Sequence, residues 1–235
     1  MPCRNPAGWQ GDQSARMERI LEPEIMDDRA GAAAYASADF SESNQWFVDQ
    51  FVAEFRERLR EIVDLGCGPA DVPMRLARAM PDSHITAVDG SLEMLKLAEP
   101  AVRGAGLESR IVLKHARIPG ATLPDAAFDA VLSKDMLHHL PDPGVLWNEA
   151  KRLVKPHGVI CVMDLVRPES FEAAKAIVEA VTPNEHPLLK QDFYNSLCAA
   201  FTIDEVRDQL RSARLPLEVE RVSSRHMRVR GRYAG

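Results

Sequence analysis

Short apolar segments alternate with amphipathic helical segments over more than one hundred residues of this chain. The apolar segments are residues 61–65, 84–89, 110–114, 128–133 and 159–163, and apolar side chains recur at helical spacing between them. Strands that are apolar throughout are typical of parallel sheets with helices on both faces. The alternation therefore predicts an α/β fold with a doubly wound, Rossmann-like sheet.

The pattern changes after residue 168. Two helical stretches, near 169–181 and 188–199, precede a third that opens with the capping box Thr202-x-x-Glu205. Two alternating runs follow at 217–222 and 225–230, separated by only two serines. Such close spacing predicts an antiparallel hairpin at the edge of the sheet.

The chain has no internal repeats, and one domain accounts for its pattern. We expect residues 1–42 to be a polar lead-in with a lid, because helical periodicity begins only near residue 43. Residues 43–235 are then a single domain, with residues 168–200 as a helical cover. Asp71 is predicted to cap the helix after the first strand, and residues 155–158 are predicted to be a turn.

Charge and composition exclude several classes of protein. The formal net charge of −6 argues against nucleic-acid binding, which normally needs a basic face. The four cysteines have no CxxC spacing, as expected in a reducing cytosol rather than in a disulfide framework. We find no apolar leader and no apolar run long enough for membrane insertion. We therefore expect a cytoplasmic protein.

A glycine-containing turn joins the first strand to the first helix. Gly66 and Gly68 allow a sharp turn and a close approach of the backbone to a ligand. Asp89 ends the second strand, where a carboxylate in a doubly wound fold can accept hydrogen bonds from ribose hydroxyls. The alternative is a tight turn without a ligand, but the joint spacing favours a nucleoside-containing ligand.

The residue at position 71 bears on whether that ligand is a dinucleotide. The dinucleotide fingerprint has a further glycine three residues after the second one. That position holds Asp71, whose carboxylate would lie against a pyrophosphate. An NAD-dependent oxidoreductase is therefore the less favoured interpretation.

The chain resembles the class I S-adenosylmethionine-dependent methyltransferases, in particular the small-molecule group that includes the ubiquinone and menaquinone methyltransferases. The resemblance covers about residues 60–165 and rests on several motifs at joint spacing. It implies a seven-stranded, mostly parallel sheet with an antiparallel last strand. The motifs are DLGCGP at 64–69, VDGSLEML at 88–95, FDAVLS at 128–133, LHHL at 137–140 and LVKPHG at 153–158.

The resemblance also implies roles for the cofactor-binding residues. The two glycines would line the methionine part, Asp64 would orient the loop or the amino group, Asp89 would hold the ribose and Met94 would pack on adenine. Ala70 replaces a frequent third glycine, a change that should be tolerated. The family often has an Asp after the third strand that this chain lacks, so we expect backbone near Ala116 and Arg117 to meet the adenine. The two glycines are Gly66 and Gly68, and the remaining members of the expected cofactor site are Cys67, Gly90, Ser133 and Lys134.

The acceptor side is less determined. Methyl transfer is an in-line displacement, so the enzyme must mainly position the acceptor and exclude water. His138 and His139 are candidate bases, although a hydrogen-bonded histidine closing the turn is the alternative for each. Arg167 can hold an anionic group, or it can pair with Asp164 or with the helix that follows; Tyr35 is a candidate lid residue.

We expect no metal site from the sequence. Asp135 and Asp164 are similar to two ligands of the catechol-type methyltransferases, but Leu165 stands where that pattern has an Asn. The predicted function is methyl transfer from S-adenosylmethionine to a small-molecule acceptor, with S-adenosylhomocysteine as product and a homodimer left open. The alternative is a non-methylating or non-enzymatic binder of S-adenosylmethionine.

Overall fold

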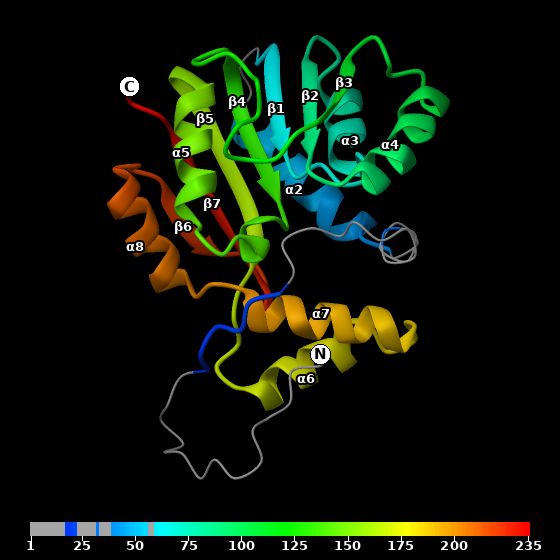
Figure 1. The fold of residues 1–235 in the computed structure, drawn as a ribbon, viewed down its shortest axis with the longest axis vertical. Helices are drawn as coiled ribbons and strands as arrows, with labels where there is room; N and C mark the ends of the chain where they lie inside the picture. The colour runs from blue at the N-terminus through cyan, green and yellow to red at the C-terminus, as the bar shows by residue number, and fades with distance from the viewer. Residues whose placement is uncertain (1–16, 23–31, 33–38, 56–58) are drawn as a thin grey trace.

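The computed structural model of the protein describes residues 17–22, 32, 39–55 and 59–235. A central sheet stands between two layers of helices, and a further pair of helices lies beyond one end of the strands (Figure 1). Tyr35 lies outside the described residues.

The sheet has seven strands in the order β3-β2-β1-β4-β5-β7-β6. The first five strands are parallel, and β7 is antiparallel to both β5 and β6. The predicted seven-stranded sheet and its antiparallel last strand are confirmed. The strands are β1 (Glu61–Leu65), β2 (His84–Asp89), β3 (Ile111–His115), β4 (Phe128–Lys134), β5 (Val154–Leu165), β6 (Glu218–Arg221) and β7 (His226–Arg232).

Helices cover both faces because neighbouring strand residues point to opposite sides. In β1, Ile62 belongs to the core formed with α2 (Ser41–Glu54), α3 (Asp71–Ala79) and α4 (Leu92–Gly104). Val63 belongs to the opposite core, with the short helix η1 (Leu137–His139), α5 (Gly144–Leu153) and α8 (Ile203–Ala213). The order of the strands reverses beside β1, which places a crevice at the carboxyl ends of β1 and β4.

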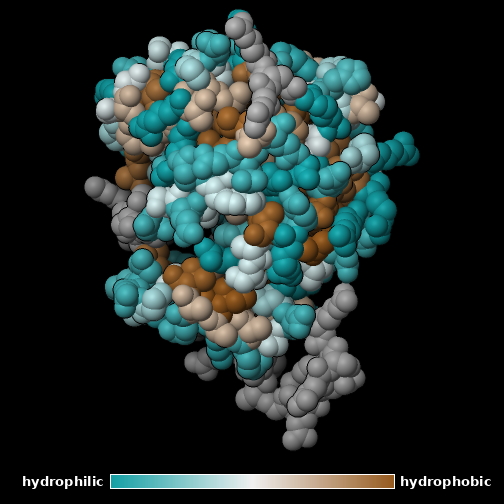
Figure 2. Space-filling view, turned by 180° about the vertical axis from the view of Figure 1, so that it is seen from behind, coloured by the Kyte–Doolittle hydropathy of each residue, from teal (hydrophilic) through white to brown (hydrophobic). Residues whose placement is uncertain are grey.

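Two helices lie beyond those carboxyl ends, where Figure 1 shows them below the sheet. They are α6 (Phe171–Val181) and α7 (Pro187–Ala199), and they share a separate apolar core with Leu165. Residues 17–22 run along them, with the Ile20 N–H donating to the Cys198 carbonyl at 3.0 Å. Brown, apolar side chains gather on the lower part of the face in Figure 2, at the level of these helices.

Two local predictions are wrong. The residue that precedes α3 is Ala70, in the left-handed region at φ 66°, and Asp71 is the first helical residue rather than the cap. Residues 155–158 belong to β5 rather than to a turn. The strand pairs with β4 on both sides of these residues, at Val154–Phe128 and at Val159–Ala130, and the register between the two pairs is irregular. The capping box at Thr202 is present as predicted.

None of the described helices combines the length and apolarity needed to span a bilayer. The division of the chain at residue 42 stays a prediction.

Candidate active site

The glycine turn after β1 lies close to the chain that follows β4, and no side chain fits at Gly66. Gly66 and Gly68 have φ values of 78° and 53°, which glycine adopts without strain. A Cβ atom built on Gly66 would lie 2.7 Å from the sulfur of Met136. At Gly66, the turn therefore presents backbone rather than a side chain to the crevice.

Asp89 ties this turn to the next one. One carboxylate oxygen accepts the Gly68 N–H at 2.7 Å, and the other accepts the Ser91 N–H at 2.8 Å. The Asp89 carbonyl accepts the Ala116 N–H at 3.0 Å. The carboxylate is thus held in a fixed place at the carboxyl ends of β1 and β2.

Asp64 is buried beneath the glycine turn, with 2% of its surface exposed. Burial, reinforced by the charge of Asp89 and opposed by Lys134, raises the pKa of Asp64 to about 7. Its Oδ1 atom has no hydrogen-bond partner among the described residues. A buried acceptor in this state is a ready partner for a cationic or N–H group of a ligand.

Two adjoining cavities meet at this turn. The first, of about 130 Å³, extends from Asp89 and Met94 to η1, where His139 and Leu140 line it. The second, of about 440 Å³, lies between the turn, α2 and α3. Four residues line both cavities, so the cavities form one cleft that passes over the glycine turn: Gly66, Gly68, Lys134 and Asp135.

Most of the predicted cofactor residues line this cleft. The first cavity includes Gly90, Met94, Ala116 and Arg117, and the second includes Asp64 and Cys67. Ser133 is buried below the cleft and donates to the Leu65 carbonyl at 2.8 Å, so it supports β1 rather than facing the cavity.

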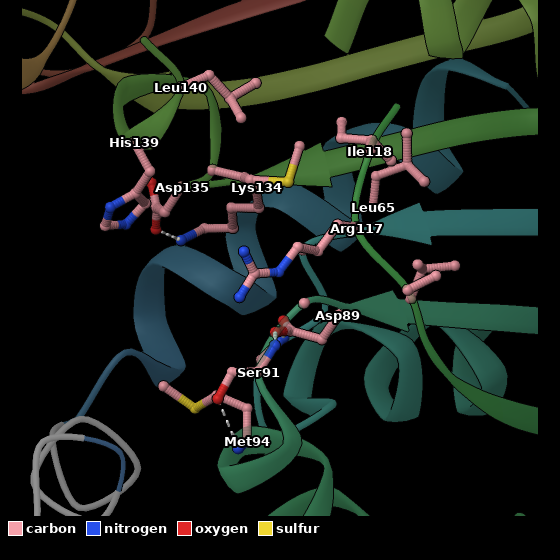
Figure 3. A pocket seen from close by; sticks show the side chains of 16 residues that line it. Leu65, Asp89, Ser91, Met94, Arg117, Ile118, Lys134, Asp135, His139 and Leu140 are labelled. Atoms are coloured by element: carbon pink, nitrogen blue, oxygen red, sulfur yellow. Dashed lines mark hydrogen bonds and ion pairs between the residues drawn. The ribbon is translucent and has the colours of Figure 1, made fainter. Parts of the chain in front are cut away.

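Charged side chains line the first cavity. Figure 3 shows Arg117 reaching into it between the Lys134–Asp135 pair and Asp89. Lys134 donates to the Asp135 carboxylate. Burial alone would raise the pKa of Asp135, but Lys134 and His226 lower it to about 2. The wall of the first cavity around Ala116 thus carries an arginine side chain, in addition to the backbone expected there from the sequence.

The two histidines after β4 occupy different environments. His139 lines the first cavity, whereas His138 is 3% exposed and its Nδ1 lies 2.7 Å from Asp164 Oδ1. Asp164 also accepts the Leu137 N–H at 2.7 Å. Burial alone would lower the pKa of His138, but the carboxylates of Asp164 and Glu22 raise it to about 9.

The N-terminal segment brings two residues to this histidine pair that the sequence analysis missed. Glu22 Oε1 lies 3.1 Å from His139 Nδ1 and 3.4 Å from His138 Nε2. Arg19 donates to the carbonyls of His138, Leu140 and Ala199 at 2.8, 2.9 and 2.6 Å. No local signal marks these residues, because the contacts join positions more than one hundred residues apart.

Arg167 lies away from both cavities of the cleft. Its guanidinium donates to the Ala200 carbonyl at 2.9 Å and pairs with Glu205, at the start of α8. Arg167 thus pairs with an acid, but the expected partners are wrong, because Glu205 belongs to α8 and is neither Asp164 nor part of the helix α6 that follows.

The described residues fit S-adenosylmethionine. The partnerless Asp64 oxygen suits its ammonium group, the fixed Asp89 carboxylate suits ribose hydroxyls, and the glycine turn gives room for the chain between them.

Comparisons with known proteins agree with this fit. Residues 63–162 match the family model described as a methyltransferase domain. The chain is 28% identical over 163 residues to 27-O-demethylrifamycin SV methyltransferase of Amycolatopsis mediterranei, covering 69% of this chain and 56% of that protein. It is 30% identical over 107 residues to demethylmenaquinone methyltransferase of Lactobacillus johnsonii, covering 45% and 44%.

A solved structure has the same fold. The crystal structure of a SAM-dependent methyltransferase from Aquifex aeolicus superimposes with a TM-score of 0.64 at 19% identity, covering 87% of this chain and 98% of that one. The chain spans about half the length of the curated relatives it matches.

Proposed function

We propose that this protein is a class I S-adenosylmethionine-dependent methyltransferase that transfers a methyl group to a small-molecule acceptor. Its residues 63–162 match the methyltransferase domain model. The observation that carries the proposal is the cleft over the glycine turn, with Asp89 fixed by the N–H groups of Gly68 and Ser91. The product is S-adenosylhomocysteine.

The cofactor occupies both cavities of the cleft. Asp64 receives the ammonium group in the second cavity, and the glycine turn accommodates the methionine chain. Asp89 holds the ribose, while Met94, Gly90 and Ala116 surround the adenine in the first cavity. Arg117 turns its guanidinium toward the adenine, where a planar cation can stack on an aromatic ring.

The cofactor supplies a methyl group on a sulfonium, so the chain must mainly position an acceptor in line with it and exclude water. The acceptor lies on the side of the first cavity that is lined by Met136, His139 and Leu140. His139 contacts the acceptor, and the buried His138 is a positioning residue, held by Asp164. Residue Tyr35 remains a lid candidate.

The remaining proposals rest on composition. A net charge of −6 supports a small-molecule rather than a nucleic-acid substrate, and the free, buried Cys67 and Cys161 support a cytoplasmic location. A homodimer stays a prediction that light scattering would decide.

Calorimetric titration with S-adenosylmethionine and S-adenosylhomocysteine tests the proposal. We expect saturable binding by the protein and its loss in Asp89→Ala, with Asp82→Asn, an exposed carboxyl on the turn before β2, as the control. Binding by the wild-type protein that Asp89→Ala retains in full would contradict the assigned site. Absence of binding by folded, ligand-free protein would refute the function and turn attention to NAD.

A further inference from the structure

Three side chains from two distant parts of the chain converge beside the first cavity. They are Glu22 from the N-terminal segment, and His138 and His139 from η1. One ligand atom from each lies within 4.8 Å of the other two. Two imidazole nitrogens and a carboxylate oxygen are a ligand set that Zn²⁺ and related divalent transition metals bind.

The two carboxylate–imidazole distances match a tetrahedral site, and the two imidazole nitrogens lie within 4.8 Å of each other. Ligand atoms at Zn–N and Zn–O bond lengths of about 2.0–2.1 Å stand about 3.3 Å apart on a tetrahedron. Glu22 Oε1 lies 3.1 Å from His139 Nδ1 and 3.4 Å from His138 Nε2. Despite this closeness, Glu22 Oε1 is buried and accepts no hydrogen bond from any described residue. The imidazole nitrogens therefore lie near this oxygen without pointing their N–H bonds at it, as expected when all three face a common centre.

Outer contacts hold the ligands in place. Asp164 accepts from Nδ1 of His138, which leaves Nε2 as the coordinating nitrogen; metal-binding histidines usually donate their other N–H in this way. Ser196 donates to the second oxygen of Glu22 at 3.3 Å. The Arg19 guanidinium donates hydrogen bonds to the carbonyls of His138 and Leu140. These bonds hold in place the backbone that carries the two imidazole rings.

We propose that Glu22, His138 and His139 bind one divalent transition metal ion of the Zn²⁺ type at the wall of the first cavity. Three protein ligands leave a fourth position open, as in catalytic rather than structural zinc sites. His139 lines the cavity, so that position is directed toward the acceptor side. There the ion would coordinate an oxygen of the acceptor; this part of the inference rests on the proposed function.

The alternative to a metal ion is a proton on His138. Two carboxylates surround His138, and a protonated imidazole would balance their charge in the absence of metal. The two accounts differ in a measurable way, because only the first predicts specific metal binding.

The test is titration of the chelator-treated full chain with Co²⁺, followed by the visible absorption of the four-coordinate ion and by its displacement with Zn²⁺. We expect one Co²⁺ per chain. Glu22→Gln should weaken binding by at least about 10-fold, and Asp164→Asn, which removes an outer contact, by about 10- to 100-fold. Glu18→Gln, an exposed carboxyl in the same segment, should bind as the wild type does.

No four-coordinate Co²⁺ signal in the wild type, or unchanged affinity in folded Glu22→Gln, would overturn the proposal. If circular dichroism shows that Glu22→Gln is unfolded, His139→Asn decides instead, because that side chain is 27% exposed. Titration of the same samples with S-adenosylmethionine separates the two proposals. Asp89→Ala should lose S-adenosylmethionine and keep Co²⁺, whereas Co²⁺ binding without any S-adenosylmethionine binding would refute the function and leave the metal site standing.

Discussion

The buried Asp64 carboxyl should make the stability of the ligand-free protein fall as pH rises. Burial raises its pKa from 3.8 to about 7. The unfolded chain releases this proton near pH 4, whereas the folded chain keeps it until near pH 7. The stability contributed by the protonated form is therefore complete below pH 4 and is lost as pH rises through 7. At about 1.4 kcal/mol per pH unit, the full difference is about 4 kcal/mol, as an upper limit.

Asp64→Asn removes this titration while keeping the shape of the side chain. Relative to the variant, the wild type should lose about 2–3 kcal/mol of unfolding free energy between pH 5 and pH 8. Urea unfolding followed by tryptophan fluorescence at pH 5, 6, 7 and 8 measures this difference. Asp82→Asn controls for the loss of a carboxyl at the surface. A difference between wild type and Asp64→Asn that stays constant across this range would refute the argument.

Four further substitutions, at three positions, test the framework of the site. Ala70→Gly should alter the unfolding free energy by less than about 1 kcal/mol, since relief of the φ 66° conformation is offset by a lost buried methyl group and a more flexible unfolded chain. Ala70→Val should cost more than about 2 kcal/mol in urea unfolding, and a neutral result would show that the left-handed conformation is not required there. Gly66→Ala should weaken S-adenosylmethionine binding in calorimetry by about 10-fold or more, because its Cβ would lie 2.7 Å from the Met136 sulfur; unchanged affinity would mean that the side chain moves freely. Thr202→Ala should lower the melting temperature through the loss of about 1 kcal/mol of capping, and S-adenosylmethionine affinity should not change.

The sheet could be predicted because its signals are local. A run of apolar residues indicates each of the first five strands. The spacing between the glycine turn and Asp89 indicates the cleft. The same spacing could not reveal that Ala70 would adopt the left-handed conformation. Alanine rarely does so, and here the Ala70 N–H donates to the Cys67 carbonyl while the Ala70 carbonyl accepts the Met74 N–H.

The surroundings of the two histidines could not be predicted for a different reason. Glu22 and Arg19 contact η1 although they lie more than one hundred residues before it, and no periodic pattern in the sequence marks such contacts. Arg117 was expected to contribute backbone, but the direction of its side chain depends on the cavity that β2, β4 and η1 build together. Likewise, Arg167 and Glu205 become partners only when α8 returns to the end of β5.

The contacts of Arg19 also have a consequence for sequence conservation and covariation. The guanidinium binds three main-chain carbonyls and no side chain of η1, so residues 138, 140 and 199 can change identity without removing its acceptors. Among related sequences, such an arginine would be retained while residues 140 and 199, which supply only carbonyls to it, change independently. Covariation between pairs of positions would then miss this contact, although it joins the beginning of the chain to the centre of the cleft.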